Sequence, residues 1–278
     1  MMKLNGKTIL ISGASSGLGF EVARLFAIRG AHEILVCRNR EKGEKAVSDI
    51  KKEVPGANLD LMVCDLESMK SIHAFIEEFG KTCSKLDMLY NNAAVMKRTR
   101  TLTEDGFEAM FQVNYLAPFI LMRSLIGYLE KGTDPQIINN GRPAEKLRLD
   151  MDDLQFENGY HMYQSFFKTK LCLLLASLEC SQRLKNEGIS VYLAEPGPFK
   201  SDLVREMPLV GWLKNLFSSP VEKAAEHMIH VMTELEGKDK NGKVFTKREA
   251  VPLTDYWKDP GIRQELWSKT ESLLENNR

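Results

Sequence analysis

A glycine-rich stretch near the N-terminus has the residue types of a phosphate-binding loop. It runs from Ser12 to Gly19 with the sequence SGASSGLG, between an apolar run at Thr8–Ile11 and an amphipathic run at Phe20–Phe26. The first run is typical of a buried strand and the second of a helix. Glycines let a backbone turn tightly, and a following helix directs free N–H groups and its positive dipole end at the turn. The pattern favours a phosphate-bearing ligand, although a turn with glycines for packing alone has the same spacing.

Two arginines follow the second predicted strand, Glu33–Cys37. In a dinucleotide site this strand end meets the adenosine ribose, where an acid binds a free 2′-hydroxyl and an arginine accommodates a 2′-phosphate. The chain has Arg38 here, Arg40 close by, and no acid before Glu41. Charge complementarity therefore favours NADP(H) over NAD(H), with a solvated surface arginine as the alternative.

The elements that position these residues alternate along the whole chain. Apolar runs predict strands at 8–11, 33–37, 59–64, 86–90, 136–138, 189–193 and 243–245. Helical spacing appears at 20–26, in a polar segment that follows Arg40 and ends at about Glu53, and at 68–79, 104–129, 162–185, 221–235 and 255–278. This alternation predicts an α/β fold of one domain, 1–278, with a Rossmann-like doubly wound parallel sheet. Ligands of such sheets lie beyond the carboxyl ends of the strands.

The composition narrows the class of protein. The 278 residues carry no net charge, so nothing electrostatic favours nucleic acid as a partner. The five cysteines form no CxxC pair, and Cys37, Cys64 and Cys172 adjoin apolar residues. We expect reduced thiols, no metal site and a cytoplasmic protein, and we see neither a signal peptide nor a membrane span. His227 and His230 share a predicted helix face without a metal motif and are expected to be half-buried or solvated.

Five motifs stand in order at the predicted strand ends. They are SGASSGLG at 12–19, DL at 65–66, NNAA at 91–94, FQVN at 111–114 and PGPFKS at 196–201. They resemble the TGxxxGxG loop, the adenine-contacting pair, NNAG, the stretch with a structural and catalytic Asn, and the PGxxxT segment of the short-chain dehydrogenases/reductases. Within that family the chain is most similar to the retinol-dehydrogenase-like branch.

The resemblance implies hydride transfer at a nicotinamide ring and an NADP(H) site. It assigns cofactor contacts to Gly13, Ser15, Ser16, Gly17, Leu18, Gly19, Arg38, Asn39, Asp65, Leu66, Asn92, Ala93, Ala94, Asn114, Lys170, Pro196, Gly197, Phe199 and Ser201.

The catalytic positions depart from the family pattern. The family uses a Ser after the fifth strand and a Tyr-xxx-Lys on the next helix, where the i, i+4 spacing lets the ammonium lower the Tyr pKa. Lys170 lies in a context that resembles this motif, but Phe166 stands four residues before it. No Ser or Thr occurs between Asp134 and Gln164. Loss of a positioned acid costs about 10²–10⁴-fold in rate, so carbonyl reduction by the usual route should be impaired.

Two interpretations follow. The first is an NADP(H)-dependent oxidoreductase with non-standard proton handling, and the alternative is a pseudoenzyme that binds NADP(H) as a sensor, scaffold or partner subunit. Tyr163 and Asn140 are the weak candidates for the missing groups, and packing beside the pocket is the simpler role for Tyr163. The catalytic candidates are Lys170, Asn114, Tyr163, Asn140 and Phe166 at the usual Tyr position.

An apolar insertion at about 203–220 follows the sixth strand. In the family this segment covers the substrate, so its composition suggests a hydrophobic or aromatic small molecule, a peripheral membrane contact through 207–217, or a lid that packs on the core. The resemblance further implies a homo-oligomer that pairs the helices predicted at 104–129 and 162–185.

Overall fold

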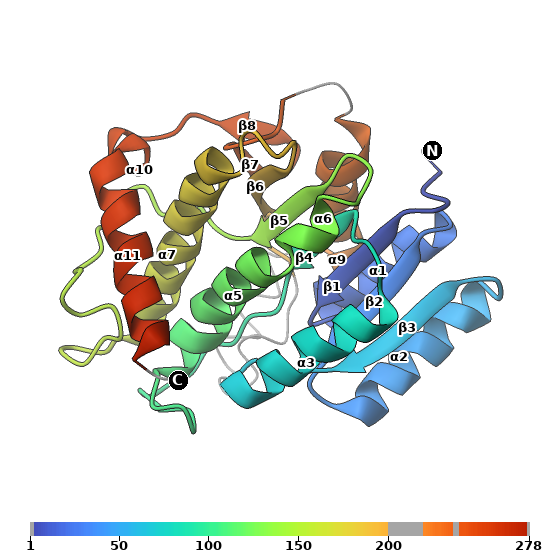
Figure 1. Ribbon diagram of the computed structural model, residues 1–278, viewed down its shortest axis with the longest axis horizontal. Coiled ribbons are helices and arrows are strands. Elements are labelled where there is room, and N and C mark those ends of the chain that lie inside the picture. Colours follow the sequence, from blue (N-terminus) through green and yellow to red (C-terminus); the bar gives the residue numbers. More distant parts are fainter. Residues whose placement is uncertain (1–2, 200–218, 236–238, 277–278) are drawn as a thin grey trace.

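An eight-stranded sheet forms the centre of the computed structural model, which describes residues 3–199, 219–235 and 239–276 (Figure 1). Its strands lie in the order β3-β2-β1-β4-β5-β6-β7-β8, and only β8 runs antiparallel to its neighbour. Their bounds are β1 Thr8–Ser12, β2 His32–Cys37, β3 Asn58–Val63, β4 Met88–Asn91, β5 Gln136–Asn140, β6 Ser190–Glu195, β7 Val244–Thr246 and β8 Glu249–Val251. The predicted doubly wound sheet is confirmed, and the three-residue β8 is an addition that its short polar sequence did not signal.

Helices cover both faces of this sheet because alternate strand residues point to opposite sides. In β1, Leu10 packs with the core under α3, α5 and α7, whereas Ile9 and Ile11 pack with the core under α1 and α9. The helix bounds are α1 Gly17–Ile28, α2 Arg40–Glu53, α3 Met69–Thr82, α4 Ala109–Phe111, η1 Gln112–Leu116, α5 Ala117–Ser124, α6 Ile126–Leu129, α7 Met162–Arg183, α9 Val221–Ile229, η3 His230–Glu234, α10 Asp255–Lys258 and α11 Pro260–Glu275.

The strand order reverses between β1 and β4. From β1 the chain crosses over to β2 and β3 on one side, and β4 continues to β5 and β6 on the other. Connections that leave in opposite directions open a crevice at the carboxyl ends of these strands. The fold therefore places the loops after β1, β4 and β5 at one ligand-binding edge.

The prediction of a single helix over 104–129 is wrong. Residues before Glu108 form a tight turn closed by a 2.8 Å bond from Thr103 N to Phe107 O, and α4 begins only at Ala109. The helix then widens to a π-turn at η1 and is interrupted at Leu125, whose ψ of 5° departs from helical geometry. Apolar spacing predicted the buried face correctly, but these breaks depend on tertiary contacts.

Helix α11 packs along α7 (Figure 1). Every residue of α7 from Thr169 to Ser181 is buried, as are Ala117–Met122 of α5. The Tyr115 hydroxyl also lies 2.6 Å from Thr270 Oγ1 of α11. The chain's own C-terminal helix therefore packs on α7 and α5, which lie in the two segments predicted to pair in a homo-oligomer.

Candidate functional site

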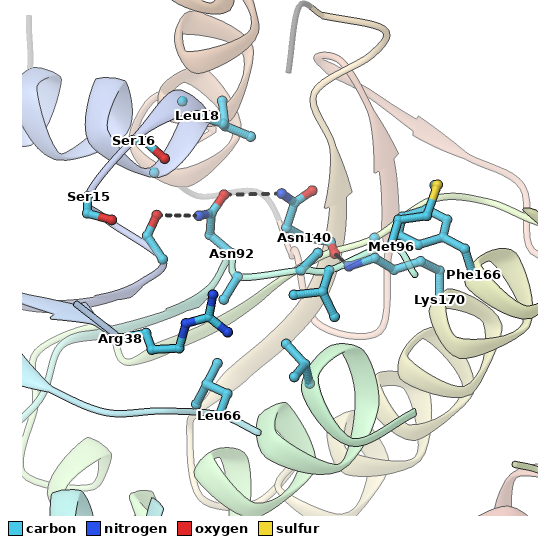
Figure 2. A pocket seen from close by; sticks show the side chains of 18 of the residues that line it. Ser15, Ser16, Leu18, Arg38, Leu66, Asn92, Met96, Asn140, Phe166 and Lys170 are labelled. Atoms are coloured by element: carbon cyan, nitrogen blue, oxygen red, sulfur yellow. Dashed lines mark hydrogen bonds between the residues drawn. The ribbon is translucent and has the colours of Figure 1, made fainter. Parts of the chain in front are cut away.

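A cavity of about 600 Å³ lies at the carboxyl ends of the strands, as the doubly wound fold predicts. Figure 2 shows Arg38 and Leu66 toward one end of it and Lys170 and Phe166 toward the other, with Asn92 between them. One continuous pocket thus joins the adenosine, phosphate and catalytic positions predicted from sequence.

The loop after β1 has the geometry of a phosphate cradle. Ser16 is the extended N-cap of α1, and its side chain makes no capping bond to any described residue, so the first N–H groups of α1 face the pocket without a side-chain partner. Gly13 and Gly17 adopt φ values of +68° and +56°, which glycine tolerates best. A Cβ on Gly19 would lie 2.4 Å from Gly13 O, so this approach of helix to loop requires a glycine.

Asn92 holds the end of β4 against this loop. Its Nδ2 donates to Ser12 O at 2.9 Å and to Gly13 O at 3.3 Å, and its Oδ1 accepts from Asn140 Nδ2 at 3.2 Å (Figure 2). The Ser12 hydroxyl accepts bonds from the main-chain N–H groups of Asn92 and Ala93. Asn92 therefore shapes the wall to which Ala93 and Ala94 also contribute.

The ends of β2 and β3 form the side of the pocket where the sequence predicts the adenosine. Arg38 lines the pocket with a side chain that is 61% exposed, and its Nη1 lies 3.4 Å from Glu67 Oε1. Asn39 caps α2 by accepting a 2.8 Å bond from Lys42 N, and Lys42 lines the pocket too. Asp65 and Leu66 also line the pocket. Lys42 was missed because a lysine in a polar helix carries no sequence signal of its own.

Lys170 of α7 lies at the far end of the pocket. Its side chain is 5% exposed, its ammonium donates a 3.0 Å hydrogen bond to Asn140 O, and burial lowers its pKa to about 8. Phe166 lies one turn earlier with its ring centroid 5.8 Å from Lys170 Nζ. Lys170 and Phe166 therefore lie one helical turn apart in the same pocket, and Lys170 is buried.

Asn114 was predicted to contact the cofactor, but it is not among the residues that line the pocket. It is fully buried in η1, where its Oδ1 accepts from Val95 N at 2.8 Å and its Nδ2 donates to Val95 O at 2.9 Å and Thr169 Oγ1 at 3.2 Å. The carboxamide is satisfied within the protein, and Val95 forms the pocket wall. In this structure the Asn114 side chain positions Val95, and its predicted cofactor and catalytic roles stay predictions. The π-turn around it is a feature that often marks functional sites.

The other predicted residues fall into two groups. Tyr163, Pro196 and Gly197 line the pocket together with Phe199. A nearby tyrosine that was not among them, Tyr160, bonds Lys97 O at 2.7 Å and is not in the pocket lining. Ser201, most of the insertion at 203–220 and the proposed membrane contact at 207–217 lie outside the described residues.

The described residues also bear on metal ligands, membrane helices, the cysteines and the two histidines. They contain no cluster of three or more metal-ligating side chains, and none of their helices is long and apolar enough to cross a membrane. All five cysteines are buried free thiols, as expected for the three that adjoin apolar residues. His227 bonds Pro196 O at 3.0 Å, and His230 bonds Glu234.

Known proteins are similar to this chain over almost its whole length. A family model described as short chain dehydrogenase matches residues 7–150. The chain is 32% identical to "Retinol dehydrogenase 12" of Bos taurus, over 98% of this chain and 88% of that protein. It is also 32% identical to "Retinol dehydrogenase 13" of Homo sapiens, over 97% of this chain and 85% of that protein.

Solved structures show the same fold. A crystal structure of an uncharacterised protein from Mycobacterium paratuberculosis matches with a TM-score of 0.79 and 24% identity, covering 99% of this chain and 96% of that one. A metagenomic short-chain oxidoreductase in complex with NADP matches with a TM-score of 0.65 and 22% identity, over 86% of this chain and 96% of that one.

Proposed function

Because this chain belongs to the short-chain dehydrogenase family, we propose that it is an NADP(H)-dependent oxidoreductase of a hydrophobic or aromatic small molecule. Its relatives are oxidoreductases by name, and two of them are named for retinol. The observation that carries the proposal is the buried Lys170 at one end of a continuous pocket that begins at the cradle before α1. A dinucleotide is long enough to need both ends of this pocket, the cradle before α1 and the region of Lys170, in one continuous cavity.

The residues present fit such a cofactor. The N-terminus of α1 takes the pyrophosphate, Asp65 and Leu66 flank the adenine position, and Pro196 and Gly197 border the nicotinamide end. Arg38 and Lys42 bring two positive charges to the end of β2, which suits a 2′-phosphate. The solved relative whose title names NADP has the same fold and supports this choice.

The bound dinucleotide would supply the hydride, and the chain must then provide a proton donor and stabilise the substrate oxygen. Phe166 has no proton to give. Lys170 is the pocket group whose pKa, about 8, lies near a physiological working pH, so we assign hydrogen bonding to the substrate oxygen to its ammonium. Tyr163, with a side chain 36% exposed at the pocket, is a weaker second donor.

The substrate class follows from the walls at this end. Phe166, Phe167 and Phe199 line the pocket together with Val95 and Met96, and Phe166 and Met96 lie beside Lys170 (Figure 2). Apolar walls of this kind favour a lipophilic body. An acceptor that is already polarised, such as an iminium, a quinone methide or an activated alkene, needs the least acid assistance. The five buried thiols suit a reducing compartment, and we propose a cytoplasmic location on that ground.

The test is a decrease of NADPH absorbance with a panel of retinal, aromatic aldehydes, quinones and activated alkenes, alongside calorimetry of NADPH binding. We expect micromolar binding and turnover with at least one class. Binding without turnover by any class would favour the pseudoenzyme, for which the relatives give no support. Absence of NADPH binding would refute the whole proposal.

A further inference from the structure

Arg142 and Glu195 are brought together by the pairing of β5 with β6. Asn140 lies beside Ala194 in the register, and Gly141 N extends the pairing with a 3.2 Å bond to Ala194 O. The next residues along the two strands are Arg142 and Glu195, with 3.5 Å between Arg142 Nε and Glu195 Oε1. Both side chains line the pocket at the end that holds Lys170.

The Arg142 guanidinium is fixed on two sides. Nε faces Glu195, and Cζ lies 5.4 Å from the centroid of the Phe167 ring. The two Nη atoms make no hydrogen bond to any described residue, and the side chain is 51% exposed. The terminal edge of the fork is therefore oriented and available, which is the arrangement that binds two oxygens of one planar anion.

The charge around this position is positive. Arg142 and Lys170 both line the pocket, and Arg142 pairs with Glu195, whose side chain is only 12% exposed, whereas the other pocket carboxylates, Asp65 and Glu67, follow β3. Burial raises the pKa of the Glu195 carboxyl, with Arg142, Thr246 and Lys247 acting in the opposite direction. The apolar walls add little screening, so an anion at the Nη edge gains more than it would in water.

We propose that Arg142 is an anion-binding residue at the substrate end of the pocket, and that it takes the carboxylate of a substrate with an apolar body. This rests on the proposed function and adds the polar part of the substrate. The phosphate cradle follows β1, and β5 lies two strands away in the sheet order, about 10 Å at ordinary strand spacing. Arg142 is thus placed for the substrate and away from the pyrophosphate.

The experiment measures binding without turnover. Calorimetry on the NADP⁺-saturated full chain would compare 2-naphthoate and dodecanoate with their methyl esters. Three variants are titrated: Arg142→Gln, Arg142→Lys and Arg123→Gln. Arg123 is a matched control outside the pocket, because it also pairs with a glutamate (Glu271, 3.0 Å) and lies 5.5 Å over a phenylalanine ring (Phe119).

We expect Arg142→Gln to weaken carboxylate binding about tenfold or more and to leave the esters and NADP⁺ unchanged. Arg142→Lys should lose most of the same affinity because it lacks the fork, and Arg123→Gln should bind like the wild type. The inference is overturned if neither carboxylate binds wild type more tightly than its ester, if Arg142→Gln binds carboxylate normally, or if NADP⁺ affinity falls in parallel. Failure of NADP⁺ to bind wild type would instead refute the proposed function.

Discussion

The ammonium of Lys170 donates a 3.0 Å hydrogen bond to the main-chain oxygen of Asn140, the last residue of β5. The Asn140 side chain in turn donates to Asn92, whose amide holds the phosphate loop. One chain of contacts therefore links α7 to the glycine-rich loop after β1 through the carboxyl ends of β5 and β4. It places the two ends of the proposed site in a fixed relation before any ligand binds.

Replacing Lys170 should raise the stability of the protein and weaken its binding of NADPH. Burial lowers the Lys170 pKa from 10.5 to about 8, so between those values the folded state binds fewer protons than the unfolded state, and wild-type stability rises with pH. Lys170→Met should remove that rise, unfold at a higher temperature at pH 7, and bind NADPH more weakly. Denaturant unfolding across pH and calorimetry measure these effects. Lys168→Met, on the same helix, is the control, and a parallel loss of stability would contradict the assignment.

The charge of Arg38 should select the cofactor. Arg38→Ala removes the guanidinium nearest the 2′-phosphate position, so NADPH affinity should fall about tenfold or more while NADH affinity stays the same. Arg40→Ala is the control, because Arg40 does not line the pocket. Titration of both dinucleotides decides the matter, and an equal loss for NADPH and NADH would refute the preference.

Adding a hydroxyl group to the Phe166 ring should raise the rate of carbonyl reduction. Its ring lies 5.8 Å from Lys170 Nζ, so Phe166→Tyr puts a phenol beside an ammonium that favours its ionised form. We expect carbonyl reduction to rise about tenfold, and further with Asn140→Ser. Phe167→Tyr lines the same pocket and is the control. A gain that persists in Phe166→Tyr/Lys170→Met would show that the phenol acts without the lysine.

Glu33 should make the protein less stable as pH rises. Both carboxylate oxygens are buried without a partner among the described residues, and burial raises the pKa of this group well above its ordinary value. As the pH rises, the unfolded chain loses this proton before the folded chain does, so wild type should become steadily less stable relative to Glu33→Gln. Denaturant unfolding at pH 4 to 8 measures this, with exposed Glu187→Gln as control. A constant difference would argue against it.

Helix α11 should keep the chain monomeric. Leu266 and Trp267 bury their side chains against the face that α7 and α5 present, so light scattering of the full chain should give the mass of one copy. Truncation after Lys258 exposes that apolar face and should cause self-association. Leu266→Ala keeps the helix and should cost about 2–5 kcal/mol of unfolding free energy. A full-length dimer that dissociates when α11 is removed would contradict this prediction.

The local signals in the chain predicted most of the fold and the cofactor end of the site. Alternating periodicities predicted the strand and helix order, and the glycines before α1 and Arg38 after β2 were identified because each directly follows its strand. The register of Phe166 and Lys170 on α7 was equally accessible, because an i, i+4 relation is a property of one helix.

The tertiary structure decided what depends on segments far apart in the chain. Arg142 meets Glu195 only because β5 pairs with β6, and Asn114 proves to be a support for Val95 only once η1 is folded against the segment after β4. The same holds for α11, which covers a helix face that sequence analysis predicted for a partner subunit. Periodicity reports which side of an element is apolar, whereas the neighbour that buries this side is fixed by strand pairing and packing across the whole chain.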